Sequence, residues 1–322
     1  MRVMLKILQH LVLSACLLGA FISNVSAQER IRISPGPVDG GQDARLMTIR
    51  SSCPEFETCT NHHAIVFVHG IFGGASTFGD WPQQLQPAIG VDKVDVYVLE
   101  YRTAMVSWLK SDVPNLDSVV ERAFDALMPL VRPEGLPRYK SINFVAHSLG
   151  GNVVAAYLHS VKSLLGHEIR ARHGFVITLG TPVLGAQIAE VAALAKSAVG
   201  MPEDRLLESL KRDNTFLRMM RYWRLLENTK SANFGCPSLS LYVGVEARPT
   251  WNFVPVVPDE SALGMASIAE EVKSFTGFSH SDLANSGPDR PQVRDWVEDK
   301  LRFEVERLRR RDPMEKLCLR DR

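Results

Sequence analysis

Short apolar runs and amphipathic segments alternate along most of the chain. The run at residues 64–68 is wholly apolar and rich in β-branched side chains, which is typical of a strand buried on both faces. Between Asn115 and Val131 the apolar positions recur at spacings of three and four, which predicts a helix with one buried face and Asn115 as its cap. The same patterns predict strands at 94–99, 142–146, 175–179 and 239–245 and helices at 152–161 and 291–311. The alternation predicts an α/β fold, with a mostly parallel sheet and helices on both faces.

One stretch interrupts this alternation. Residues 186–235 contain amphipathic helical patterns and no strand pattern, and they precede the strand at 239–245, which we take as the penultimate strand of the sheet. We interpret this insertion as extra helices packed against the edge of the sheet. A mobile lid over an apolar site is the alternative interpretation.

The first 27 residues have the pattern of a secretory signal peptide. Two basic residues precede an apolar stretch at 7–22, and the small-residue pattern Val25-Ser26-Ala27 follows it, so we expect cleavage after Ala27. An uncleaved membrane anchor is one alternative, because the apolar stretch approaches the length of a bilayer span. A lipoprotein processing box ending at Cys16 is another. The main prediction is an exported protein, periplasmic or secreted.

Composition and charge narrow the class of protein. The chain has 322 residues, of which 45% are apolar, and carries 37 basic against 36 acidic side chains. Such a composition is typical of a folded globular protein and gives no electrostatic reason to bind nucleic acid. Residues 302–322 hold eight basic and five acidic side chains, which we interpret as a solvated helix end; contact with an anionic membrane surface is the alternative.

The expected domain organisation is simple. We expect a leader at 28–60, one catalytic domain at 61–311 and a tail at 312–322. Without Cys16, four cysteines remain, and an even number in an exported protein indicates disulfides. Cys53 and Cys59 flank a short loop and are expected to pair, which leaves Cys236 for Cys318. Four free thiols are the alternative.

A metal site formed by Cys59 with His62 and His63 is an alternative to the disulfide. The chain has no second ligand cluster with zinc-site spacing, so we predict no metal and no other cofactor.

Ser148 is the candidate nucleophile. It lies in Ala146-His147-Ser148-Leu149-Gly150, between a predicted apolar strand and a predicted helix. This arrangement is the nucleophile elbow, in which a sharp turn exposes the serine hydroxyl at the carboxyl edge of the sheet. The small residues Ala146 and Gly150 allow the strand and the helix to approach closely.

A glycine-rich loop supplies the second candidate feature. His69-Gly70-Ile71-Phe72-Gly73-Gly74 follows the first predicted strand, where this architecture places part of an oxyanion hole. Ester hydrolysis builds negative charge on the carbonyl oxygen, and two fixed backbone N–H groups stabilise it. By position, these groups belong to Ile71 and Leu149.

His280 is the candidate base, because it follows the last predicted strand and histidine can accept a proton near neutral pH. His147 is the rival nearest in sequence, but we expect it to pack beneath the turn. Other histidines, among them His173, are expected to be solvated. For the acid, the chain order serine, acid, histidine favours Glu246, directly after the strand at 239–245. The alternative acids are Asp259 and Glu260.

Several motifs together resemble the α/β-hydrolase superfamily, and its lipase-like serine esterases most. They are F-V-H-G-I-F-G-G, V-A-H-S-L-G-G-N, T-L-G-T-P-V-L-G, V-P-D-E-S-A and S-H-S-D-L. The run from L-Y-V-G-V-E-A-R-P-T to V-V-P-D-E-S-A-L-G is similar to the serine-active-site-containing esterases related to GPI inositol-deacylases. Two departures are Ala146 in place of glycine and the absence of the G-x-x-D-x-V-P acid motif.

The sequence therefore leads to one main hypothesis. We expect an exported, metal-free serine hydrolase that cleaves carboxylic esters, with an acyl ester or lipid-like small molecule as substrate. A thioesterase, an amidase or an acyltransferase would use the same residues. A hydrolase fold that serves only as a binding module is the remaining alternative.

Overall fold

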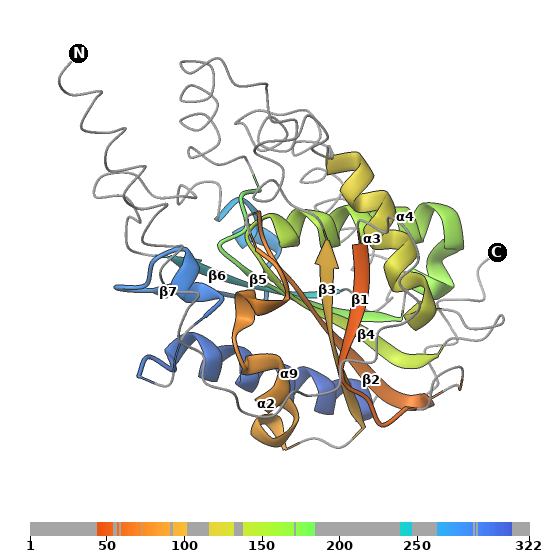
Figure 1. Ribbon diagram of the computed structural model, residues 1–322, viewed down its shortest axis with the longest axis horizontal. Helices are drawn as coiled ribbons and strands as arrows, with labels where there is room; N and C mark the ends of the chain where they lie inside the picture. Colours follow the sequence, from red (N-terminus) through yellow and green to blue (C-terminus); the bar gives the residue numbers. More distant parts are fainter. Residues whose placement is uncertain are drawn as a thin grey trace, which may run out of the picture. The chain divides into compact units, whose positions relative to one another are not determined.

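A computed structural model of the chain contains a seven-stranded sheet in the part of the chain that it describes, with strand order β1-β3-β2-β4-β5-β6-β7 (Figure 1). The strands are β1 (Ala44–Arg50), β2 (Cys59–Val68), β3 (Val94–Tyr101), β4 (Tyr139–His147), β5 (His173–Leu179), β6 (Ser240–Glu246) and β7 (Glu271–Phe275). Strand β1 is antiparallel to β3, and the other neighbouring pairs are parallel. The expected mostly parallel α/β fold is therefore confirmed.

The structure describes residues 44–53, 57, 59–71, 73–90, 93–101, 116–131, 138–170, 172–183, 239–246, 263–285, 287 and 289–310. All of them belong to one compact unit, residues 37–322. Several expectations lie outside the described residues: the signal peptide at 1–27, the insertion at 186–235, the tail at 312–322, Asp259, Glu260, Cys236 and Cys318. No helix among the described residues is long and apolar enough to cross a bilayer.

Helices cover both faces of the sheet. They are α2 (Trp81–Ile89), α3 (Leu116–Val131), α4 (Leu149–Arg170) and α9 (Gln292–Arg310), with short 3-10 turns at Ala75–Phe78, Leu263–Ile268 and Ser281–Leu283. Helices α3 and α4 lie on one face, and α2 and α9 lie on the other (Figure 1). Side chains alternate along β2, so Val66 packs in the core beneath α3 and α4, while Phe67 packs against Trp81 of α2. This two-sided burial explains the wholly apolar run in β2.

Apart from the 3-10 turns, the sequence pattern did not locate two strands and one helix of the described structure. Strands β1 and β7 lie at the two edges of the sheet and carry exposed or half-exposed positions, so neither has an uninterrupted apolar run. Strand β1 also lies within the stretch that the sequence analysis assigned to a leader. Helix α2 is short and contains two prolines. The expectation that His173 is solvated was wrong, because it is buried in β5 and contacts the Tyr157 hydroxyl.

A disulfide joins Cys53 to Cys59 at the start of β2, the pairing that their spacing favours. Asp95 holds the backbone directly before the disulfide. Its fully buried carboxylate accepts hydrogen bonds from the backbone of Ser52 at 2.8 Å and from the Tyr139 hydroxyl at 2.8 Å. Because Asp95 and Tyr139 lie near the starts of β3 and β4, this network lies at the amino edge of the sheet.

Candidate active site

The predicted site residues follow the ends of neighbouring parallel strands. Gly70 follows β2, Ser148 follows β4, and Glu246 is the last residue of β6. His280 lies five residues after β7, at the start of a 3-10 turn. Carboxyl ends of parallel strands share one edge of a sheet, so the fold brings these four residues to the same edge.

Ser148 has the backbone conformation of a nucleophile elbow. Its φ is +54°, a left-handed value that non-glycine residues rarely adopt. Its backbone N–H donates to the Leu179 carbonyl at 2.8 Å, which fixes the turn to the end of β5. Because α4 begins at Leu149, directly after Ser148, the strand passes into the helix within a single residue.

The elbow packs directly on the end of β2. A Cβ atom on Gly150 would lie 2.3 Å from the Val68 carbonyl oxygen and 2.6 Å from the His69 carbonyl oxygen. Backbone atoms cannot move aside as a flexible side chain could. Gly150 therefore allows the first turn of α4 to approach β2 closely, as the sequence pattern requires.

His280 and Glu246 form a buried pair. His280 Nδ1 lies 2.9 Å from Glu246 Oε2 and 3.0 Å from Oε1, and the two residues are only 9% and 3% exposed. An ionised carboxylate only accepts hydrogen bonds, so this contact assigns the proton to Nδ1 and the lone pair of the neutral ring to Nε2. Glu246 is the acid that the chain order favours. Asp259, the alternative, lies outside the described residues.

Gly180 provides the space that this pair occupies. A Cβ atom on Gly180 would lie 2.7 Å from Glu246 Oε2 and 2.9 Å from His280 Nδ1, and the residue has a φ of +60°. Since Gly180 directly follows Leu179, to which Ser148 is hydrogen-bonded, the pair lies beside the elbow. Sequence reasoning missed the role of Gly180, because its partners come from distant segments.

The glycine-rich loop touches the side chain of Ser148. A Cβ atom on Gly70 would lie 2.6 Å from Ser148 Cβ and 3.1 Å from Ser148 Oγ. The Gly70 carbonyl accepts hydrogen bonds from His69 Nδ1 at 2.9 Å and from the backbone of Gly73 at 3.1 Å. In a trans peptide the N–H and the C=O lie in one plane and point in opposite directions, so the Ile71 N–H points away from the contacts of the Gly70 carbonyl.

The other predicted oxyanion donor is Leu149. It is fully buried and is the first residue of α4. The first amides of a helix have no acceptor within that helix, so the N–H of Leu149 starts without a partner inside α4. Leu149 thus adjoins Ser148 in the chain, and Ile71 adjoins Gly70, which lies against the Ser148 side chain.

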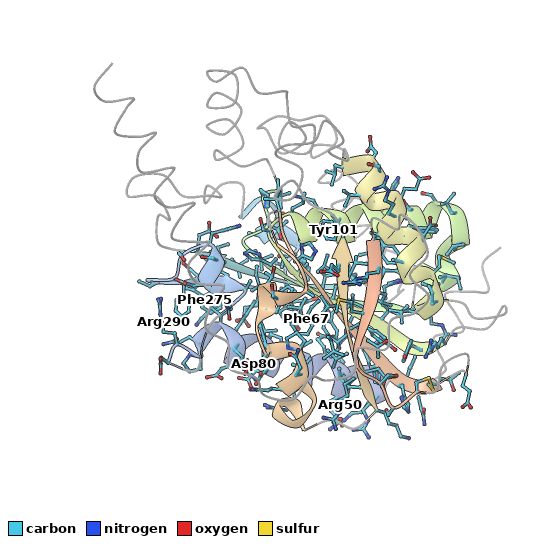
Figure 2. The ribbon with its side chains drawn as sticks, in the orientation of Figure 1. Arg50, Phe67, Asp80, Tyr101, Phe275 and Arg290 are labelled. Carbon is cyan, nitrogen blue, oxygen red and sulfur yellow. A yellow bond between two sulfur atoms is a disulfide. The ribbon has the colours of Figure 1, made fainter. Side chains whose placement is uncertain are left out.

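His69 is held in place from β3. Its Nε2 accepts a hydrogen bond from the Tyr101 backbone at 3.2 Å, and the two rings stack with centroids 4.2 Å apart. The Tyr101 hydroxyl donates to the His69 carbonyl, and Figure 2 shows Tyr101 at the end of β3. Burial lowers the pKa of His69, so the ring stays neutral and keeps its proton on Nδ1. No motif in the sequence singled out Tyr101.

His147, the rival base, is buried, and burial lowers its pKa to about 3. Its Nε2–H donates to the backbone carbonyl of His280 at 2.9 Å. This nitrogen is therefore already hydrogen-bonded to a peptide carbonyl, which argues against His147 as the base that activates Ser148.

The metal hypothesis is not supported among the described residues. The sulfur of Cys59 is bonded to Cys53, and His63 is buried against the Ser141 hydroxyl at 2.8 Å. In the described parts of the chain, no three or more His, Cys, Asp or Glu side chains are grouped to hold a metal ion.

The parallel sheet, the elbow after β4 and the histidine after the last strand define the α/β-hydrolase fold. Solved structures share it. The chain is similar to a "putative hydrolase" from Agrobacterium vitis S4, with 14% identity, 83% of this chain and 96% of that chain covered, and a TM-score of 0.53. It is also similar to an esterase from Pyrobaculum calidifontis, with 15% identity, 82% and 80% coverage and a TM-score of 0.50.

At the level of sequence families, residues 58–203 match the family described as "Putative serine esterase (DUF676)". No curated protein matches the sequence significantly. The matched segment includes the glycine-rich loop and the elbow, so the family-level resemblance is to serine esterases.

A glycine-to-alanine pair tests the packing at the histidine. We expect Gly180→Ala to lower the free energy of unfolding by about 2–4 kcal/mol, because it adds steric overlap to the cost of a left-handed alanine. Gly90→Ala is the matched control, since Gly90 has a φ of +62° and nothing within 4 Å of its Cβ position. It should cost about 1–2 kcal/mol. Urea unfolding measures the free energy of unfolding of both variants. An equal loss in the two would contradict the close packing of Gly180 against Glu246 and His280.

Proposed function

We propose that this chain is a serine hydrolase that cleaves carboxylic esters through an acyl-enzyme formed on Ser148. The observation that carries the proposal is the convergence at one sheet edge of a serine with φ of +54°, a loop packed against its side chain, and a buried histidine–glutamate pair beside it. The family-level match to serine esterases supports the same reaction class.

The first half-reaction acylates the serine. His280 Nε2 accepts the hydroxyl proton of Ser148 while Oγ attacks the ester carbonyl carbon, which gives a tetrahedral intermediate with a negatively charged oxygen. The imidazolium then gives its proton to the leaving alkoxide, so an alcohol departs and an acyl-serine remains. Glu246 stabilises the positive charge on the ring and fixes its orientation.

Two backbone amides stabilise the intermediate. In this proposal the N–H groups of Ile71 and Leu149 donate to the oxyanion, and the hydrogen bonds of His69 and Gly73 to the Gly70 carbonyl fix the loop beforehand. A preorganised donor needs no reorientation during the reaction. Removal of one such donor typically costs about 3–4 kcal/mol in activation free energy.

The second half-reaction restores the enzyme. His280 removes a proton from water, the resulting hydroxide attacks the acyl carbon, and the tetrahedral intermediate collapses with release of a carboxylic acid. Ser148 regains its proton from His280. The net reaction consumes one ester and one water and produces one acid and one alcohol, and it needs no cofactor.

We also propose that the reaction takes place outside the cytoplasm. The signal-peptide pattern of residues 1–27 supports export, and the disulfide between Cys53 and Cys59 is compatible with an oxidising compartment. An acyl ester or lipid-like small molecule is the proposed substrate class.

Replacement of the nucleophile tests the proposal. We expect Ser148→Ala to abolish turnover of a p-nitrophenyl acyl ester, because no hydroxyl remains to be acylated. Ser141→Ala is the control: this buried serine lies on the same strand, near its amino end, and contacts His63. It should retain turnover. Undiminished hydrolysis by Ser148→Ala would reject the assignment.

A second pair of variants tests the acid. Glu246→Gln keeps the shape of the side chain but removes its negative charge, so kcat should fall by roughly 10⁴-fold. Asp259→Asn should leave kcat within about threefold of the parent, on the same scale. If Asp259→Asn caused the larger loss, Asp259 would be the acid and the pairing of Glu246 with His280 would be only structural.

A further inference from the structure

One polar contact connects the strand of the nucleophile to the loop of the base. His147 is the last residue of β4 and directly precedes Ser148. Its Nε2–H donates to the backbone carbonyl of His280 at 2.9 Å, and the two imidazole rings lie 4.7 Å apart between centroids with a tilt of 44°. The residue that precedes the candidate nucleophile is therefore hydrogen-bonded to the backbone of the candidate base.

The hydrogen-bonding state of His147 is fixed by its surroundings. It is 7% exposed, and its low pKa keeps the ring neutral throughout the pH range in which proteins are normally active. A neutral ring that donates from Nε2 carries its lone pair on Nδ1, and this buried Nδ1 makes no hydrogen bond within the described residues. An unpartnered buried acceptor costs free energy, so space filling alone would favour an apolar residue at this position.

Three polar contacts in the described part of the His280 loop are local to it. Arg290 donates to the Gly277 carbonyl at 2.5 Å and pairs with Asp282 at 3.2 Å, and Asp282 accepts the Ser279 N–H at 2.8 Å. These contacts hold the loop to itself, and none of them involves β4. Thus they shape the loop but do not set its distance from the nucleophile.

Glu246 and His147 hold different parts of His280. Glu246 binds Nδ1 of the side chain, which fixes the rotation of the ring. His147 binds the backbone carbonyl, which fixes the point from which the side chain projects. Both contacts are needed to fix the position of Nε2 relative to Ser148. With the Glu246 contact alone the backbone of His280 could shift, and with the His147 contact alone the ring could rotate.

We propose that His147 is a positioning residue, whose hydrogen bond to the His280 carbonyl fixes the place of His280 beside Ser148. The inference rests on the proposed function. A misplacement of reacting groups by about 1 Å can cost roughly 10²-fold in rate, so the contact affects the chemical step. Because the His147 side chain is buried and its Nε2–H is bonded to a peptide carbonyl, we expect its loss to change kcat more than KM.

Three variants with a matched control test this role. For His147→Leu we expect kcat on a p-nitrophenyl ester to fall roughly 10- to 100-fold while KM stays within about twofold. His147→Gln places an amide N–H near the position of Nε2 and should recover most of kcat. His147→Met matches the length of glutamine without a donor, and it replaces leucine in the comparison if His147→Leu fails to fold.

His173→Leu is the control for the loss of a buried histidine. His173 is 3% exposed and contacts the Tyr157 hydroxyl at 3.1 Å, but it lies at the start of β5, away from the site. It should leave kcat within about threefold of the parent. Circular dichroism and urea unfolding establish that each variant is folded.

The outcomes separate the two proposals. No turnover by the parent chain would reject the proposed function itself. If the parent is active, the role of His147 is overturned by a kcat in His147→Leu or His147→Met equal to the parent value. It is also overturned if His147→Gln is no better than these variants, or if His173→Leu loses as much activity.

Discussion

The site depends on the close approach of the first turn of α4 to the end of β2. Gly150 lies directly on the carbonyl groups of Val68 and His69, where no side-chain atom has room. This backbone packing forces the left-handed turn at Ser148 and brings the serine side chain against Gly70. A positive φ at a serine costs of the order of 1–3 kcal/mol of conformational free energy. The packing of the surrounding sheet must offset this cost.

Hydrogen bonds and close contacts connect the elbow to the neighbouring strands, and these strands position the other residues of the site. The Ser148 N–H is bonded to the end of β5, and the next residue, Gly180, leaves the space in which Glu246 and His280 meet. On the other side, Tyr101 of β3 fixes His69, which in turn fixes the Gly70 carbonyl. Each group is thus held by an element of the sheet, and such rigid support is what preorganised catalysis requires.

Much of the sheet could be predicted because buried parallel strands have continuous apolar sequences. The run at 64–68 in β2 is the example, since helices cover both faces of this strand. The edge strands β1 and β7 could not be found in this way, because their exposed faces carry polar side chains. Ser148, His280 and Glu246 were accessible through a local motif and chain order. Tyr101 and Gly180 were not, because their contacts exist only after distant segments fold together, and the catalytic roles of all these residues stay predictions.

The central claim is that Ser148 is the nucleophile, and the most direct measurement is the position of a covalent adduct. The protein is treated with a fluorophosphonate, which reacts with activated serines, and is then digested and sequenced by mass spectrometry. We expect one equivalent of adduct, on Ser148, and none after prior unfolding in urea, because activation depends on His280 and on the fold. An unmodified Ser148, or an adduct on a different residue, would contradict it.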